Sequence, residues 1–147
     1  MTDIIQKYFN DKLTADDFVE RNIFYPPADL NNIVAVEKLL DIKFPQDYKD
    51  FLTISNGYNG MLGQSYVRLT KVEEIVENTN GYCKEFFPWT IHIGTDGGGE
   101  MYVLDIREKK IKYGAMPYIG EDKDFILLGD TFEEFARHLY YNDYWDK

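Results

Sequence analysis

Apolar and polar residues alternate most clearly in the middle of the chain, from Trp89 to Ile93. This period of two is typical of a strand with one buried face. Gly97–Gly99 then permit a sharp change of direction, and residues 102–105 return to a strand-like composition. The pattern predicts a β-hairpin over residues 89–105. We expect Gly98 to take a positive φ angle in the turn, so that Gly98→Val would cost about 1–3 kcal/mol.

Apolar residues recur at helical spacing before the hairpin, and the breaks between them predict two helices. The first covers residues 29–41, and its N-cap candidates are Asp29, Asn31 and Asn32. The second opens at Pro45, a favoured first position, and ends at residues 56–57, where glycine can take a left-handed conformation. The polar residues of this second helix are expected to face water: Gln46, Asp47, Lys49 and Asp50.

Two later segments have the spacing of a capping box, which starts a helix by pairing two side chains with backbone N–H groups. Thr70 is paired with Glu73 in one, and Thr131 with Glu134 in the other. We expect a helix to follow each, the second being the last helix of the chain. The remaining segments are predicted to be a loop at residues 57–63 and strands at residues 66–69, 111–115 and 125–128.

The beginning of the chain gives weaker signals. One face of a short helix would be formed by Ile4, Ile5, Tyr8 and Phe9. A second short helix could start at Thr14 and include Phe18 and Val19. Residues 25–27 must be extended, because proline restricts itself and the residue before it. We therefore predict an accessory lead-in over residues 1–27 and a main domain over residues 28–147.

The net charge of −10, from 26 acidic and 16 basic residues, narrows the classes of function. Nucleic-acid binding needs a basic surface, and anionic membranes repel an acidic protein, so neither is expected as a partner. The charge would attract a basic partner or simply keep the protein soluble. The chain has no start that resembles a signal peptide and no apolar run near the ~20 residues that span a bilayer. We expect a cytoplasmic protein.

Patterns that would indicate catalysis or a bound cofactor are weak. The glycines of the hairpin match no nucleotide-binding motif, and no predicted helix follows them. His92 and His138 lie on different predicted elements, and the single Cys83 excludes an internal disulfide. His92 could join nearby acids in a metal site, but an ordinary surface or groove position is favoured. His138 suits the end of the last helix. We expect no catalytic residue, no metal site and no cofactor.

Several motifs occur in the order found in a known family. They are E-K-L-L-D at residues 37–41, F-P-Q-D-Y-K-D-F-L at 44–52, N-G at 56–57, I-G-T-D-G-G-G at 93–99, L-D at 104–105 and T-F-E-E-F at 131–135. In this combination the chain resembles the SUKH superfamily from about Asn32 to Leu139. That superfamily includes bacterial toxin-immunity proteins and a fungal cell-wall assembly regulator.

The resemblance implies both a fold and a function. The implied fold is an α+β domain, in which a twisted, mostly antiparallel sheet packs against N-terminal helices and a C-terminal helix. The implied function is non-enzymatic: binding and neutralising a polymorphic toxin, commonly a nuclease or deaminase. A toxin with a basic cleft for nucleic acid would suit an acidic inhibitor. The alternative is a regulatory scaffold that binds a host protein in signalling or in assembly of the cell envelope.

Two acidic segments are candidates for the partner-binding surface, because neither has an evident place in the core. The residues are Glu121, Asp122 and Asp124 in a predicted loop, and Asp143, Tyr144 and Trp145 in the C-terminal tail. Carboxylates at the rim of an interface mainly steer the encounter, whereas Tyr and Trp are frequent anchors. Trp145 is therefore the candidate anchor, with a place over the domain's own core as the alternative.

Overall fold

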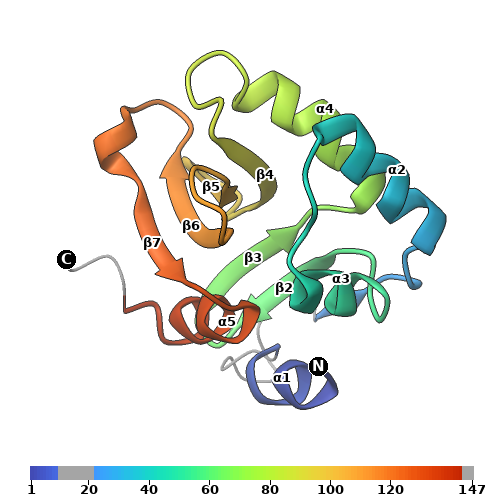
Figure 1. The fold of residues 1–147 in the computed structure, drawn as a ribbon. Helices are drawn as coiled ribbons and strands as arrows, with labels where there is room; N and C mark the ends of the chain where they lie inside the picture. Colours follow the sequence, from blue (N-terminus) through green and yellow to red (C-terminus); the bar gives the residue numbers. More distant parts are fainter. Residues whose placement is uncertain (10–21, 144–147) are drawn as a thin grey trace.

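Each strand of the fold pairs with its neighbours in the chain, so that the described strands form one antiparallel sheet in the order β1 to β7 (Figure 1). The structure is a computed structural model and describes residues 1–9 and 22–143. The strands are β1 (Ile23–Phe24), β2 (Tyr58–Leu62), β3 (Ser65–Leu69), β4 (Thr90–Thr95), β5 (Glu100–Asp105), β6 (Lys112–Pro117) and β7 (Ile126–Gly129). The helices are α1 (Thr2–Tyr8), α2 (Leu30–Leu40), α3 (Gln46–Leu52), α4 (Val72–Tyr82) and α5 (Phe132–Tyr141), with a 3₁₀ turn, η1 (Asp122–Asp124). The α+β fold expected from the family resemblance is confirmed.

The predicted central hairpin is confirmed as β4 and β5, but its turn differs from the prediction at Gly98. The positive φ angle belongs to Gly97, at 83°, and Gly98 is outside that region. The cause is Asp96, whose Oδ1 accepts hydrogen bonds from the N–H groups of Gly98 at 2.8 Å and Glu100 at 3.3 Å. This carboxylate fixes the turn so that Gly97 is the residue that reverses direction.

A strand replaces the loop that was predicted for residues 57–63. Residues 58–62 form β2, which is antiparallel to β3 over its whole length. The three glycines and the asparagine of residues 57–63 suggested a loop, yet the other side chains of β2 are buried in the sheet: Tyr58, Met61 and Leu62. Cross-strand pairing and burial therefore outweighed the low strand propensity of glycine and asparagine.

The two expected capping boxes have different outcomes. Thr131 caps α5 as predicted, because its hydroxyl accepts a hydrogen bond from the N–H of Glu134 at 3.1 Å. The other box is wrong: α4 starts one residue after Lys71 without a local side-chain cap. Its first N–H, on Val72, donates to Asn56 Oδ1 at 2.8 Å, while Asn56 Nδ2 donates to Glu73 at 2.8 Å. Asn56, from the segment between α3 and β2, thus supplies the side-chain cap that was expected from Thr70.

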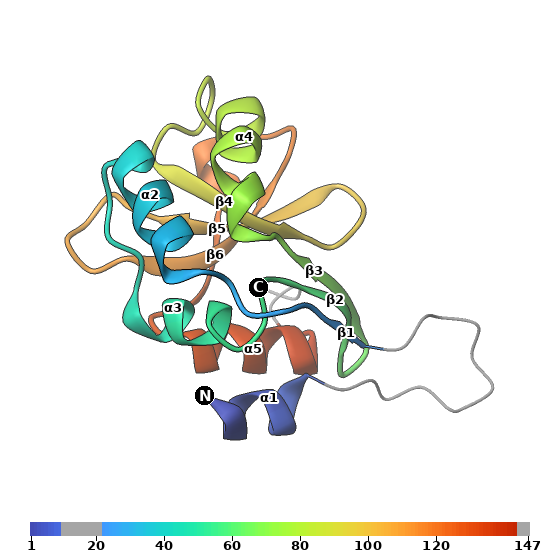
Figure 2. The same cartoon turned by 90° about the vertical axis from the view of Figure 1, so that its right-hand side faces the viewer.

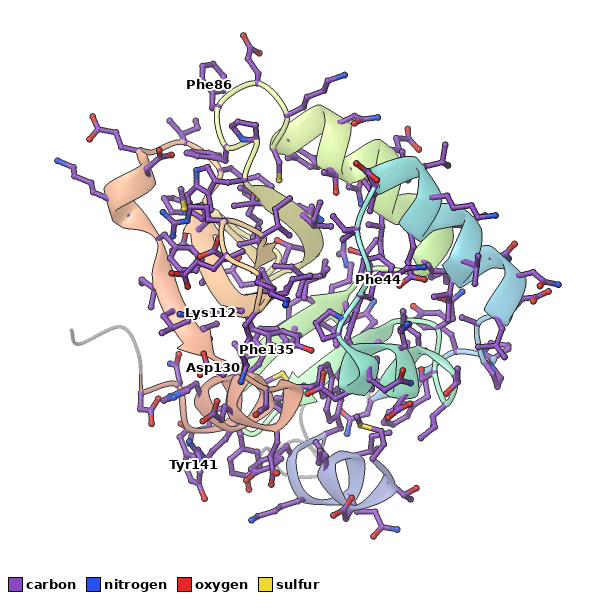
Figure 3. The ribbon with its side chains drawn as sticks, viewed as in Figure 1. Phe44, Phe86, Lys112, Asp130, Phe135 and Tyr141 are labelled. Atoms are coloured by element: carbon purple, nitrogen blue, oxygen red, sulfur yellow. The ribbon has the colours of Figure 1, made fainter. Side chains whose placement is uncertain are left out.

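The main core contains a cluster of aromatic rings between the sheet and its helices. Phe9 stacks on Phe51 with ring centroids 5.2 Å apart and meets Tyr58 edge-on at 4.8 Å. Phe135 of α5 points from the helix toward the sheet (Figure 3). Helix α1 lies beside α5, and Figure 2 shows α5 between α1 and the rest of the fold. Described residues before Pro26 therefore take part in the core, whereas the helix predicted around residues 14–19 lies outside the described residues.

Two polar residues that were expected to face water instead connect elements. Asp47 is partly buried, and its two oxygens accept hydrogen bonds from the Tyr113 hydroxyl and the Phe132 N–H, both at 2.7 Å. Lys49 forms an ion pair with the buried Glu37 at 3.4 Å, and Glu37 also accepts from the N–H of Phe44 at 2.7 Å. The spacing along α3 identified a polar face, but α2 and α5 cover part of that face.

Candidate partner-binding groove and acidic loop

The sheet has a second, smaller apolar face opposite the main core. Met101 and Val103 of β5 and Met116 of β6 are buried there, because successive side chains on a strand point to opposite faces. Two segments cover them, residues 83–89 after α4 and residues 118–125 before β7. Exposed side chains of these two covering segments form part of the candidate site.

The covering segments are joined at Trp89. Its Nε1–H donates to Asp122 Oδ1 at 3.1 Å, and its ring meets Phe125 edge-on at a centroid distance of 5.3 Å. The guanidinium of Arg107 lies over the ring of Trp89, 3.7 Å from its centroid. The same guanidinium forms an ion pair with Asp105 at 2.9 Å. Asp122 is thereby attached to the domain although its side chain is exposed.

The predicted acidic loop is a structured 3₁₀ turn. Asp124 Oδ2 accepts from the N–H of Glu121 at 2.8 Å, and Glu121 forms an ion pair with Lys123 at 3.3 Å. Glu121, Asp122 and Asp124 are exposed. Burial, and after it the charges of Asp96 and Asp124, raises the pKa of Glu100. The acidic loop therefore lies near the turn of the central hairpin, and the two form one acidic region.

The C-terminal candidates are not brought next to this loop by any contact among the described residues. Asp143 follows α5, and its Oδ1 is hydrogen-bonded to His138 Nδ1 at 2.7 Å. His138 itself is in the last turn of α5, as predicted. Tyr144 and Trp145 lie outside the described residues.

A groove of about 410 Å³ lies between α4 and the strands β2, β3 and β4. It exists because β3 and β4 pair only at Arg68–Thr95 and Leu69–Gly94, so the strands diverge beyond these pairs. One wall is the face of α4 that carries Glu74, Asn78 and Tyr82, at intervals of four residues. The other lining residues are Tyr25, Asn59, Arg68, Leu69, Thr70, Lys71, His92, Thr95 and Tyr118.

His92 forms the floor of this groove and is only 3% exposed. Its Nε2 lies 2.9 Å from the Tyr118 hydroxyl, and its ring stacks on Tyr82 at a centroid distance of 5.3 Å. Its buried Nδ1 has no hydrogen-bond partner among the described residues. Burial lowers the pKa of His92 from 6.5 to about 4. Of the two positions favoured from the sequence, the groove is correct and the exposed surface is wrong.

Three exposed, largely apolar side chains lie on the groove wall and on the two covering segments. Tyr82 is 51% exposed, Phe86 69% and Ile119 95%. Figure 3 shows Phe86 at the tip of the loop after α4, pointing away from the body of the molecule. Ile119 directly follows Tyr118, which lines the groove, and one residue separates Ile119 from Glu121 of the acidic loop. We call Tyr82, Phe86 and Ile119 the apolar rim; aromatic side chains in such positions are typical of protein interfaces.

The described residues offer little that resembles a catalytic or metal centre. No group of three or more His, Cys, Asp or Glu side chains in residues 1–9 and 22–143 is arranged to hold a metal ion. Cys83 is the first residue of a covering segment and is buried against the sheet, and burial raises the pKa of its thiol, which makes it a poor nucleophile. Within the same residues, no helix has the length and apolarity required to span a membrane.

The pKa of His92 leads to a measurable pH dependence of stability. The unfolded chain binds a proton at this residue near pH 6.5, whereas the folded protein does so only near pH 4. Stability is therefore fully present above pH 6.5 and decreases as the pH falls toward 4, by on the order of 3 kcal/mol from this group. We expect the free energy of unfolding to decrease more in the wild type than in His92→Gln between pH 6.5 and pH 4, and the difference between the two decreases to be on the order of 3 kcal/mol.

His138→Gln is the matched control, since it removes the other histidine and leaves the buried ring of His92 in place, so the loss of stability that depends on His92 should persist. Nuclear magnetic resonance titration of the two imidazoles gives an independent reading. A His92 ring that titrates near pH 6.5 would contradict the buried, uncharged state described here.

Sequence reasoning missed the groove, with the exception of His92. Its lining comes from the segment after β1, from three strands, from α4 and from the covering segment 118–125, so no single motif contains it. The one available signal was the interval of four residues between Glu74, Asn78 and Tyr82, which places an aromatic ring on the polar side of a helix.

Comparison with known proteins agrees with the motifs that the sequence contains. Residues 27–138 match the model of the SMI1/KNR4 family, SUKH-1. The chain is 32% identical over 113 residues to the protein YnaB of Bacillus subtilis (strain 168), which is described as uncharacterized; the match covers 75% of this chain and 74% of that protein. The family match and the identity over most of both chains show that this protein belongs to the SMI1/KNR4 family (SUKH-1).

Proposed function

We propose that this protein is an immunity protein, which binds and neutralises a cognate polymorphic toxin that acts as a nuclease or deaminase. The observation that carries the proposal is the acidic loop next to the apolar rim. Glu121, Asp122 and Asp124 are exposed, and the loop that holds them is attached to the domain by the contact of Trp89 with Asp122. Membership of a family that includes toxin-immunity proteins supports the same reading.

The physical argument is one of charge. A toxin that acts on nucleic acid needs a basic cleft, and a protein with a net charge of −10 is attracted to it. A loop already fixed in one conformation loses little conformational entropy on binding. The apolar rim would then supply the desolvated contacts from which most binding free energy derives. We propose that the C-terminal residues Asp143, Tyr144 and Trp145 also contact the toxin, with Trp145 as an anchor.

We further propose that the protein has no catalytic activity of its own and acts in the cytoplasm, where it would meet the toxin before release. A regulatory scaffold that binds a host protein is the alternative. Co-expression with candidate toxin domains, taken first from genes adjacent to the one that encodes this protein, tests the proposal directly. Cells should survive toxin expression only when this protein is present, and the two proteins should elute as one complex. Survival without complex formation, or no protection at all, would favour the alternative.

Charge neutralisation in the acidic loop should slow association without changing dissociation. The variant is Glu121→Gln, Asp122→Asn and Asp124→Asn, which removes three charges but keeps an acceptor oxygen at each position, so that the bonds to Trp89 and the Glu121 N–H are retained. We expect the association rate constant for a catalytically inactive toxin to fall about tenfold at low salt, with a weaker salt dependence.

A matched control removes three exposed charges elsewhere: Asp41→Asn, Glu77→Gln and Glu133→Gln. It changes the net charge by the same amount, so it separates a local effect from the general field of the protein. Equal slowing by both triple variants, measured by stopped-flow or surface plasmon resonance, would place the binding surface away from the acidic loop.

A further inference from the structure

We propose that the groove binds a carboxylate-bearing side chain of the protein partner, with Arg68 as the residue that pairs with it. The inference deepens the proposed function and rests on it in naming the toxin as that partner. The partner would therefore present one acidic residue toward the groove within a surface that is otherwise basic.

Arg68 is an exposed arginine that lines the groove, and its guanidinium has no hydrogen bond or ion pair with a described residue. Arg107, by contrast, is held by Asp105 and Trp89. A guanidinium presents a planar set of donors that binds a carboxylate through two parallel hydrogen bonds. Arg68 also lies in one of the two residue pairs that join β3 to β4, so its backbone is fixed in the sheet.

A second cation, Lys71, lines the same groove. The ammonium of Lys71 is 4.4 Å from the centroid of the Tyr25 ring, and both residues line the groove. Glu74 is the acidic residue of the lining, so the groove carries two basic groups and one acidic group. The whole chain has 26 acidic and 16 basic residues, so this local excess of positive charge is opposite in sign to the net charge of the protein. An anionic group approaching elsewhere is repelled, and the groove is where it is accepted.

The walls and the floor suit the stem of a side chain more than a second charge. Tyr25, Tyr82 and Tyr118 provide rings against which methylene groups or an aromatic ring can pack. The floor residue His92 is uncharged at neutral pH, so it does not compete with Arg68 for the carboxylate. A volume of about 410 Å³ accommodates side chains of a short extended segment.

The two charged regions together give a rule for partner choice. The acidic loop attracts basic residues, while the groove requires an acidic one at a fixed position relative to them. A basic surface without that acidic residue leaves Arg68 unpaired when the contact is desolvated, which is unfavourable. The groove would thus contribute to the discrimination between toxins that are all basic.

The experiment adds two short peptides, each with blocked termini, to the full-length protein in separate titrations. In one peptide a single tyrosine is flanked by glutamates, and in the other it is flanked by lysines. Nuclear magnetic resonance shifts of the Arg68 Nε–H and of the backbone N–H of Thr95 report binding at the groove. We expect the glutamate peptide to shift both signals, with weaker binding at higher salt. Arg68→Glu should weaken this binding at least about tenfold, and Arg68→Lys should weaken it less.

Arg137→Glu is the matched control, because Arg137 is an exposed arginine on α5 and the change in charge is identical. Equal loss of binding in Arg137→Glu, shifts caused by the lysine peptide, or no shifts at all would each overturn the inference. Inorganic phosphate is added in a parallel titration, and binding of phosphate as tight as that of the glutamate peptide would make the groove a small-anion site instead.

This experiment can fail independently of the immunity function. If wild-type protein protects cells from a candidate toxin but the glutamate peptide does not bind, the groove assignment is wrong and the proposed function stands. If the peptide binds through Arg68 but no protection occurs, the toxin is not the partner. Protection that is lost in Arg68→Glu and kept in Arg137→Glu, with unchanged melting curves, would support both.

Discussion

Gly94→Val should reduce the free energy of unfolding by about 3 kcal/mol or more. The pairing of β4 with β5 has a register shift between His92 and Gly94, and on the other side of β4 Gly94 is paired with Leu69 of β3. A Cβ atom at Gly94 would lie 2.6 Å from the carbonyl oxygen of Arg68, which is backbone and cannot move without breaking the pairing of β3 with β4. In a domain of this length, about 3 kcal/mol corresponds to a fall in Tm of about 6–12 °C.

Gly98→Val is the matched control from the same glycine-rich segment. The nearest heavy atom to a Cβ at Gly98 is Asp96 Oδ1 at 3.5 Å, an ordinary contact, and its φ angle is not in the left-handed region. We expect a change within about 0.5 kcal/mol, in place of the larger loss predicted from the sequence. Chemical denaturation of both variants gives the comparison. Equal losses in the two variants would mean that the close approach of β3 and β4 does not limit residue 94.

The elements with strong local signals were predictable from the sequence. Alternation in β4 and the glycines after it identified the hairpin, and Asp29 accepts from the N–H of Asn31 at 2.8 Å as an N-cap should. Such signals are local because they depend on bonds between residues a few positions apart. The family resemblance then supplied the α+β arrangement, which periodicity alone does not fix.

The candidate site was less predictable because it depends on pairing between distant segments. Alternation correctly placed His92 on the face opposite Ile91, but it cannot tell whether a second layer covers that face. Here the covering segments 83–89 and 118–125 bury it. The groove itself results from how few residue pairs join β3 to β4, and register of that kind is not visible in either strand. The acidic loop was identified from the sequence as an exposed segment, because its contacts are mainly between residues a few positions apart.

The motifs that carry the family resemblance have structural contacts in common. Glu37 belongs to E-K-L-L-D and accepts a hydrogen bond from Phe44, the first residue of F-P-Q-D-Y-K-D-F-L. Asp47 belongs to that second motif and accepts from Phe132, which belongs to T-F-E-E-F. The polar residues of the motifs thus join α2 to α3 and α3 to α5. This explains why the motifs indicate the fold better than they indicate a binding site.

Asp47→Ala should destabilise the protein by about 3 kcal/mol, because it leaves two donors without an acceptor. One is the hydroxyl of the buried Tyr113 and the other is the N–H of Phe132 at the start of α5. Burial, and after it the carboxylate of Asp47, raises the pKa of Tyr113, so this hydroxyl stays protonated and acts as the donor. The carboxylate also favours the positive end of the α5 dipole.

Asp50→Ala controls for the loss of an aspartate from the same helix. Asp50 is exposed and accepts a hydrogen bond from Gln46 at 2.8 Å, so we expect a change within about 0.5 kcal/mol. A double-mutant cycle supplies the second test. The variant Tyr113→Phe removes one of the two donors that Asp47 satisfies. In the double variant Asp47→Ala, Tyr113→Phe, the loss of stability should be smaller than the sum of the losses in the two single variants by about 1 kcal/mol or more. Strict additivity, measured by urea unfolding of all four proteins, would show that the bond between α3 and β6 contributes nothing and that Asp47 acts through α5 alone.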